Sequence, residues 1–184
     1  MSVETIMYVA AKIFASKGYR STRLDDIARK LNVSKPALYY YIDSKYQILV
    51  LIFEKIMDIY ITNANEIIKM NLAPEDKFKG LVRKHAMALV ENQELSKIFF
   101  HERAQLTLTE QKELYRKVRV YEAIFEQAYL VGQGTSFKNL NVQIVIKGIF
   151  GMINSLYYYE GQKTASSPEI VNVYIEILEE GFKI

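Results

Sequence analysis

The chain has 184 residues, of which 50% are apolar and 24% are charged, a balance typical of a globular protein rather than a disordered one. It contains no cysteine, which excludes a disulfide framework, a thiolate metal site and cysteine catalysis. With only two histidines, we expect no histidine-rich metal site and no cofactor. Eight glycines and three prolines argue against many short strands joined by tight turns.

The apolar runs are short; Ile48 to Phe53 is among the longest, whereas a membrane-spanning helix needs roughly 18 apolar residues. The chain also lacks the basic start followed by an apolar stretch that is typical of a signal peptide. We therefore expect a cytoplasmic protein that does not bind a membrane.

The positive charge is concentrated in the first quarter of the chain. Residues 1–48 hold 8 Lys and Arg against 4 Asp and Glu, a net +4, and the remainder holds 16 against 17, a net −1. This asymmetry indicates a polyanionic partner for the first segment. A solvated basic face without a partner is the alternative.

Apolar residues recur at the helical period through nearly the whole chain, which predicts an all-α protein. A first helix has its apolar face at Val3, Ile6, Met7, Ala10, Ile13 and Phe14 and ends at Gly18. A second is indicated by Leu24, Ile27, Ala28 and Leu31, with Thr22 or Arg23 just outside it and Asp25 and Asp26 in its first turn, where the helix dipole favours acids.

A third, short helix is capped by Ser34, opened by Lys35 and Pro36 and ended at Ile42 and Asp43. Ser44 caps a fourth helix, predicted from Lys45 to about Met70. Later helices are predicted at about Glu75–Glu91, Glu94–Arg103, Glu110–Val131, Val142–Tyr159 and Glu169–Glu180.

The third helix divides its residues unusually. At 100° per residue, Leu38, Tyr41 and Ile42 share one side with Ser34, and the opposite side holds Pro36, Tyr39 and Tyr40, flanked by Lys35 and Ala37. This acid-free face suits a DNA groove, because tyrosine hydroxyls and lysine bind phosphates and small apolar groups contact thymine methyls. Burial of the tyrosines against the rest of the chain is the alternative.

Two short helices joined by a tight turn, the second of them suited to DNA, are typical of a helix-turn-helix. Over residues 3–50 the sequence resembles, without a gap, the amino-terminal domain of the TetR family of transcriptional repressors. The residues that carry the resemblance are Phe14, Gly18, Tyr19, Thr22, Asp26-Ile27-Ala28, Leu31 to Lys35, Leu38 to Ile42, Lys45 and Ile48-Leu49.

The resemblance implies a DNA-binding domain at residues 1–48 and an all-helical regulatory domain, for ligand binding and dimerisation, at residues 49–184. It implies that Thr22 caps the second helix and contacts a phosphate, and that Lys45 lies near the DNA backbone. It also implies that the recognition helix contacts DNA through Lys35, Pro36, Ala37, Tyr39, Tyr40 and Tyr41. Two residues depart from the family pattern: Ile42 replaces a usual Phe, and Tyr41 replaces a frequent His.

Within the regulatory part, Arg119 to Phe137 and Gly151 to Tyr158 resemble the subgroup of the family that senses fatty-acyl or other coenzyme A thioesters. The resemblance implies a small lipophilic effector, for which a fatty-acyl-CoA is our hypothesis. Aromatic and arginine side chains are the candidate ligand-binding residues: Phe99, Phe100, Arg103, Arg119, Tyr121, Phe125, Tyr129, Phe150 and Tyr157. A plain apolar core, with solvated arginines, is the alternative.

The last two helices predict a homodimer, because two helices from each subunit would form a four-helix bundle. The candidate interface residues are apolar or small: Ile144, Gly148, Gly151, Ile153, Tyr174 and Ile177. Burial of these residues within the monomer is the alternative.

Enzyme motifs are incomplete. His101 and Glu102 begin a zinc-protease pattern, but Gln105 stands where the second histidine is required. We therefore expect no enzyme, and favour a ligand-responsive repressor that binds palindromic operator DNA as a homodimer and is released by its effector. A helical enzyme or carrier for a lipophilic substrate is one alternative, and an adaptor that binds another protein through Tyr39 to Tyr41 is another.

Overall fold

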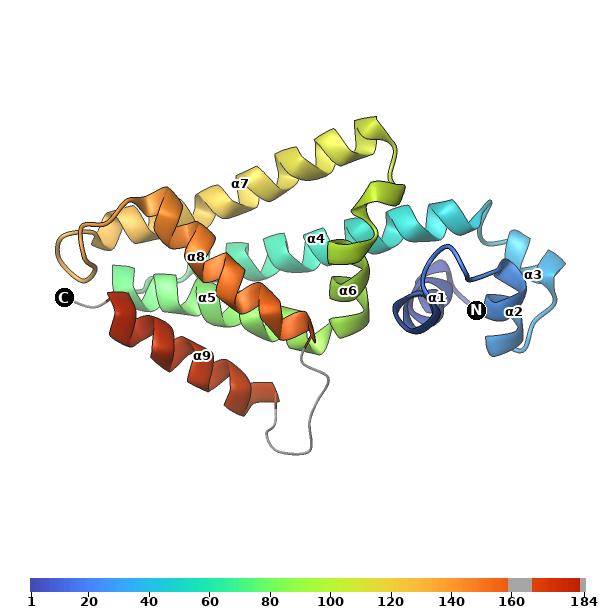
Figure 1. Ribbon diagram of the computed structural model, residues 1–184, viewed down its shortest axis with the longest axis horizontal. Helices are drawn as coiled ribbons and strands as arrows, with labels where there is room; N and C mark the ends of the chain where they lie inside the picture. The colour runs from blue at the N-terminus through green and yellow to red at the C-terminus, as the bar shows by residue number, and fades with distance from the viewer. Residues whose placement is uncertain (159–166, 183–184) are drawn as a thin grey trace. The chain divides into compact units, whose positions relative to one another are not determined.

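The computed structural model describes residues 1–158 and 167–182. Within these ranges every regular element is a helix, apart from one isolated bridge between Gln133 and Phe137 (Figure 1). The predicted all-α fold is confirmed. The chain packs as two compact units, one formed by residues 1–57 and 94–112 and the other by residues 58–93 and 113–184.

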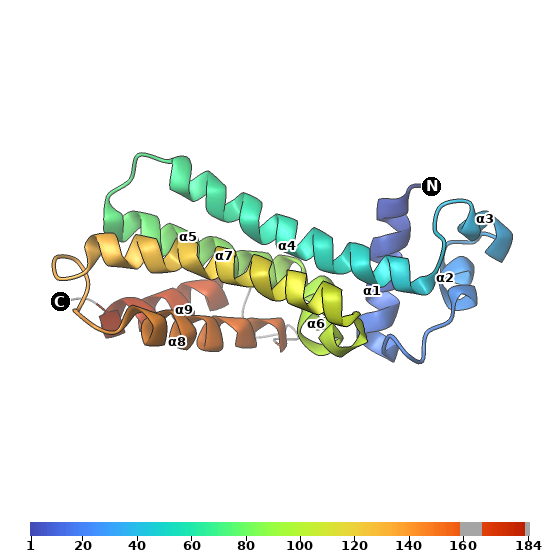
Figure 2. The same ribbon diagram turned by 90° about the horizontal axis from the view of Figure 1, so that it is seen from above.

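The first unit begins with three helices, α1 (Val3–Lys17), α2 (Leu24–Lys30) and α3 (Lys35–Tyr39), which group beside the first turns of α4 (Lys45–Lys69) (Figure 2). The predicted end of α1 is confirmed, because Gly18 takes a φ of +86° that other residues rarely adopt. The apolar faces predicted for the first two helices meet in its core, where Ile6, Phe14 and Ile27 are buried.

α3 ends earlier than the sequence predicts. The helix stops at Tyr39, and Tyr40 and Tyr41 form a turn in which the N–H groups of Tyr41 and Ile42 both donate to the carbonyl of Leu38, at 3.0 and 3.2 Å. The carbonyl of Leu38 thus accepts both hydrogen bonds that end the helix. The chain then continues to α4, and Ile42 remains buried.

The first unit also contains α6 (Gln93–His101), apart from its first residue, and the 3₁₀ turn η1 (Arg103–Gln105). Phe99 of α6 packs on Phe53 of α4, with the ring centroids 5.8 Å apart. The predicted division at residue 48 concerns function rather than packing, and it stays a prediction.

The second unit contains α5 (Pro74–Glu91), most of α7 (Leu108–Gly132), α8 (Val142–Asn154), the 3₁₀ turn η2 (Ser155–Tyr158) and α9 (Ser167–Phe182). α5 is its central helix, since it contacts α8, η2 and α9. The last turn of the helix predicted at Val142–Tyr159 is the 3₁₀ turn η2, and Tyr159 lies outside the described residues.

Candidate nucleic-acid interface and regulatory core

The recognition face predicted on α3 is exposed. Leu38 and Ile42 are buried and hold the helix to the unit. Lys35 and Pro36 are exposed, as are Tyr39 and Tyr40, the latter with 83% of its surface accessible. The alternative that these two tyrosines are buried in the chain is therefore wrong. Ala37 is half-buried, and so is Tyr41, whose ring meets the edge of the Tyr40 ring at 5.2 Å.

Two local features set the angle between α2 and α3. Asn32 lies in the left-handed region at φ +56°, which asparagine tolerates better than most residues and which turns the chain sharply after α2. The Ser34 hydroxyl then accepts a hydrogen bond from the Ala37 N–H at 3.3 Å, which starts α3 as predicted.

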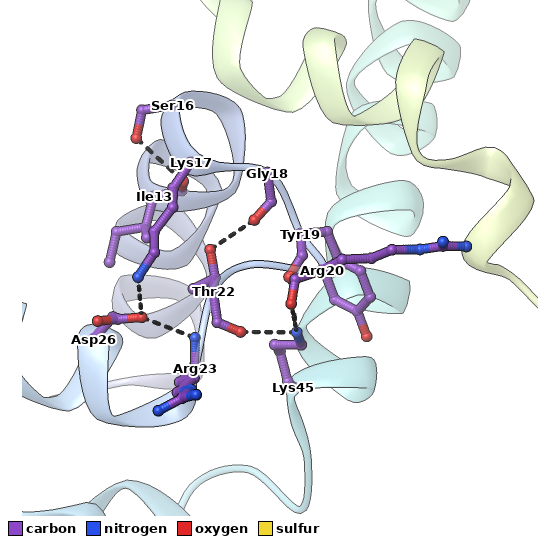
Figure 3. A network of polar contacts seen from close by, with 10 residues as sticks. All are labelled: Ile13, Ser16, Lys17, Gly18, Tyr19, Arg20, Thr22, Arg23, Asp26 and Lys45. Carbon is purple, nitrogen blue, oxygen red and sulfur yellow. Dashed lines mark hydrogen bonds and ion pairs between the residues drawn. The ribbon is translucent and has the colours of Figure 1, made fainter.

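Thr22 does not cap α2, contrary to the prediction. Its hydroxyl donates to the carbonyl of Gly18 at 2.8 Å, and the residue is 1% exposed. The start of α2 is closed instead by the carboxylate of Asp26, which accepts from the Arg23 N–H at 2.9 Å and from the Lys17 ammonium at 2.7 Å (Figure 3). The hydrogen bond from Lys17, and then that from Arg23, lower the pKa of Asp26.

Lys45 also has an internal role that its sequence position does not reveal. Its ammonium donates to the carbonyls of Tyr19, Thr22 and Arg20 at 2.7, 2.8 and 3.4 Å (Figure 3), and it lies 4.3 Å from the centre of the Tyr19 ring. An ammonium has three donors, and all three are used within the chain. Partial burial lowers the pKa of Lys45, although nearby Glu102 opposes the shift.

The loop before α2 is also held from α6 and η1. Glu102 accepts a hydrogen bond from the backbone N–H of Tyr19 at 3.3 Å, and Gln105 accepts one from the Arg20 guanidinium at 3.2 Å. Sequence reasoning missed both residues, because the bonded groups are more than 80 positions apart. The loop before α2 is therefore held by hydrogen bonds from Lys45 to its carbonyls and by hydrogen bonds from Tyr19 and Arg20 to Glu102 and Gln105.

Three of the predicted ligand-binding residues converge in the second unit. The rings of Tyr121, Phe125 and Phe150 lie 4.9–5.9 Å apart by their centroids, and all three are buried. Tyr60 stacks on Tyr121 at 5.8 Å, and the imidazole of His85 lies 4.9 Å from Phe150. These five rings are called the aromatic core below.

His85 gives the aromatic core a polar centre. Its Nδ1 lies 3.0 Å from the Tyr121 hydroxyl and its Nε2 lies 3.0 Å from Oδ1 of Asn154. Burial lowers the pKa of His85 to about 4 despite the bond to Asn154, so the imidazole is neutral near pH 7. Burial also raises the pKa of Tyr121, so its hydroxyl keeps the proton that it donates to Nδ1.

Sequence reasoning missed His85, Asn154 and Tyr60. For His85 a signal existed: it lies on the apolar face of α5, at helical spacing from Phe78, Leu81, Val82 and Leu89. A histidine at such a position is buried and needs polar partners, but spacing does not identify them.

The other predicted ligand-binding residues lie elsewhere. Tyr129 packs with Phe78 and Phe137, and Tyr157 is buried in η2. Phe99, Phe100 and Arg103 belong to the first unit, where the Arg103 guanidinium lies over both rings at 4.3 and 5.3 Å. Arg119 is exposed and pairs with Glu122 at 2.8 Å. The predicted set is therefore divided among several places in the described chain.

The predicted dimer residues lie mostly on an exposed face of α8 and α9. Ile144 is 71% exposed and Ile177 is 56% exposed, and a Cβ added at Gly148 or Gly151 would meet nothing within 4 Å. Tyr174 is half-buried, with its hydroxyl 3.1 Å from that of Ser155. Ile153 is different: it is fully buried inside its own subunit, so its assignment to the interface is wrong.

Two family models together cover most of the chain. Residues 6–52 match the bacterial regulatory proteins of the tetR family, and residues 71–182 match the tetracyclin repressor-like C-terminal domain. The chain belongs to the TetR family. It is therefore a DNA-binding transcriptional regulator, and its partners are operator DNA and a second copy of itself.

Among curated relatives, the fatty acid metabolism regulator protein of Bacillus subtilis (strain 168) is 24% identical over 151 residues, which are 81% of this chain and 78% of the relative. The negative transcriptional regulator IcaR of the biofilm operon icaADBC, from Staphylococcus aureus (strain Newman), is 42% identical over 62 residues, which are 34% of this chain and 31% of the relative.

Among solved structures, the ketosteroid transcriptional regulator KstR2 of Mycobacterium tuberculosis matches with a TM-score of 0.91, at 18% identity over 99% of this chain and 95% of that one. FadR of Bacillus subtilis, solved with stearoyl-CoA, matches with a TM-score of 0.74, at 22% identity over 97% and 98% of the two chains. At these identities the likeness establishes the shared TetR-family fold. No described helix is long and apolar enough to cross a membrane.

Proposed function

We propose that this TetR-family chain is a ligand-responsive repressor, not an enzyme, that acts in the cytoplasm. The observation that carries the proposal is the face of α3, which has no acid of its own and exposes Lys35, Pro36, Tyr39 and Tyr40 on a helix anchored by its opposite side. Such a helix inserts into the major groove, where its first residues contact base edges and its tyrosines contact phosphates.

The homodimer places two copies of α3 on successive major grooves of a palindromic operator, roughly 34–36 Å apart. The exposed stripe of Ile144, Gly148 and Gly151 on α8 and the exposed Ile177 on α9 are the surface that we assign to the interface. Small residues at this position allow two α8 helices to approach closely.

The DNA-binding part is tested by a gel shift with the DNA upstream of the chain's own gene, with a random duplex of equal length as competitor. Lys35→Ala and Pro36→Ala should change the sequence preference, because base contacts carry specificity. Lys12→Ala is the matched control, since Lys12 is also exposed but lies on α1. Equal behaviour of the Lys35 and Lys12 variants would contradict the assigned face.

For the effector we propose a fatty-acyl-CoA, bound at the aromatic core. Support comes from the stearoyl-CoA complex of FadR and from the relative named for fatty acid metabolism. The aromatic core is apolar, because Tyr121, Phe125 and Phe150 are buried, and an acyl chain that enters it has to separate rings that are in contact here. The neutral His85 adds a restriction: an unpaired carboxylate is costly to bury there, so the buried part of the ligand is the acyl chain and its uncharged thioester.

Calorimetry with a chain-length series of acyl-CoAs tests this assignment. Affinity should rise by roughly 0.8 kcal/mol per buried methylene until the second unit buries no more of the chain, and free coenzyme A and free fatty acids should bind more weakly. The thioesters that bind should also release the operator, by about 5- to 150-fold for a coupling of 1–3 kcal/mol. Tight binding that leaves the DNA affinity unchanged would favour the alternative of a lipophilic-substrate carrier.

A further inference from the structure

An acidic residue stands next to the first residue of the recognition helix. Oδ2 of Asp25, in the first turn of α2, lies 3.1 Å from Nζ of Lys35, the first residue of α3. Both side chains are about half exposed, 51% for Asp25 and 46% for Lys35. An exposed ion pair of this kind stabilises the fold little. Its main effect is to place a negative charge beside Lys35 on the DNA-binding surface.

Asp26, the neighbouring acid on α2, is bonded to other groups and not to Lys35. The carboxylate of Asp26 is turned to Lys17 and to the backbone N–H of Arg23. Asp25 is thus the carboxylate paired with Lys35, and its charge lies on the surface that Lys35 presents.

The position of Asp25 restricts what Lys35 binds well. A DNA atom that accepts a hydrogen bond from the Lys35 ammonium lies about 3 Å from Nζ, and therefore within about 6 Å of the Asp25 carboxylate. A phosphate there brings two anions together, which is unfavourable. The O6 and N7 atoms of guanine are neutral acceptors in the major groove, so they accept from Lys35 without that repulsion.

We propose that Asp25 is a specificity determinant of the DNA-binding surface: it disfavours contacts of Lys35 with phosphates and leaves the ammonium for a neutral base-edge acceptor such as guanine. Non-specific binding rests almost entirely on phosphate contacts, so binding to random DNA is then penalised more than binding to the operator. The inference rests on the proposed DNA-binding function of α3 and adds a residue outside that helix.

The test compares wild type with Asp25→Asn, which keeps the size of the side chain and removes its charge. Glu4→Gln is the matched control, because the Glu4 carboxylate is also exposed and paired with a lysine, Lys55 at 2.7 Å, in the same unit. Fluorescence anisotropy of the full-length dimer gives Kd for the operator and for a random duplex of equal length, each at several KCl concentrations.

Asp25→Asn should tighten binding to the random duplex by about 5-fold, as expected for an exposed charge interaction in each of two subunits. Operator binding should change less than 2-fold, so the specificity ratio falls. The salt dependence on random DNA should steepen by about 1 per subunit as Lys35 gains a phosphate. Glu4→Gln should leave the specificity ratio unchanged, and Asp25→Asn should lose its effect when Lys35 is replaced by Ala.

Equal tightening on both duplexes would overturn the inference, because it would show only a general charge effect. So would an effect of Asp25→Asn that persists without Lys35, or a loss of operator affinity alone. A wild-type dimer that binds neither duplex would refute the proposed function itself, a result that is visible before any variant is made.

Discussion

The buried imidazole of His85 predicts a specific loss of stability in weak acid. In the folded chain the pKa of His85 is lowered to about 4, from an ordinary value of 6.5, by burial. Between these two pKa values the unfolded chain binds a proton at His85, whereas in the folded chain this imidazole stays neutral. The resulting stabilisation is complete above about pH 6.5 and declines as the pH falls towards 4.

The size of the effect follows from the two pKa values. One pKa unit corresponds to about 1.4 kcal/mol, and the loss between pH 7 and pH 5 amounts to about 2 kcal/mol for this histidine. Most carboxylates remain ionised in this interval, so the imidazole dominates the change in stability.

Urea unfolding followed by circular dichroism, at fixed protein concentration, measures the effect. Wild type should lose about 2 kcal/mol between pH 7 and pH 5, and His85→Gln should lose much less, although it is less stable at pH 7. His101→Gln is the matched control for the loss of a histidine, since His101 is exposed on α6 and not buried in the aromatic core. Parallel curves for wild type and His85→Gln would refute the reasoning.

Three further predictions concern the hydrogen bonds of Lys45, the dimer interface and the packing around Gly132. Lys45→Met should lower the free energy of unfolding by about 1–3 kcal/mol, because three carbonyls lose a charged donor. It should leave the salt dependence of DNA binding unchanged, and a shallower salt dependence with an unaltered melting temperature would contradict this prediction. Ile177→Glu should dissociate the dimer in sedimentation while the subunit stays folded. Ile153→Glu should instead unfold the subunit, since this substitution buries a charge; a folded monomer from both variants would contradict the different placement of the two residues. Gly132→Ala should cost about 1–3 kcal/mol in thermal unfolding, because the new Cβ would lie 2.7 Å from the Phe137 ring, and adding Phe137→Leu should recover part of that loss; an unaltered melting temperature would show that the ring moves freely.

Local chemistry explains why the helices could be predicted so well. The end of α1 at Gly18 and the start of α3 at Ser34 depend on residues within a few positions of each other, and so does the division of α3 into a buried side at Leu38 and an exposed side at Tyr39. These features need only the helical period and the capping preferences of single residues. The block of motifs over residues 3–50 was enough to indicate the family.

Tertiary structure decided which side chains use their polar groups inside the chain. Lys45 and Thr22 occupy positions that suggest DNA contacts, but their donors bond the loop between α1 and α2. His85 obtains its partners from α7 and α8, and Ile153 is buried in its own subunit, whereas Ile144 on the same helix is exposed. Lys45, His85 and Ile153 share one physical reason: the sequence shows the residue and its helix, but the groups that it meets belong to distant parts of the chain, and only the folded packing brings them together. Thr22 differs, because its partner Gly18 is only four positions away and the local geometry of the loop decides the bond.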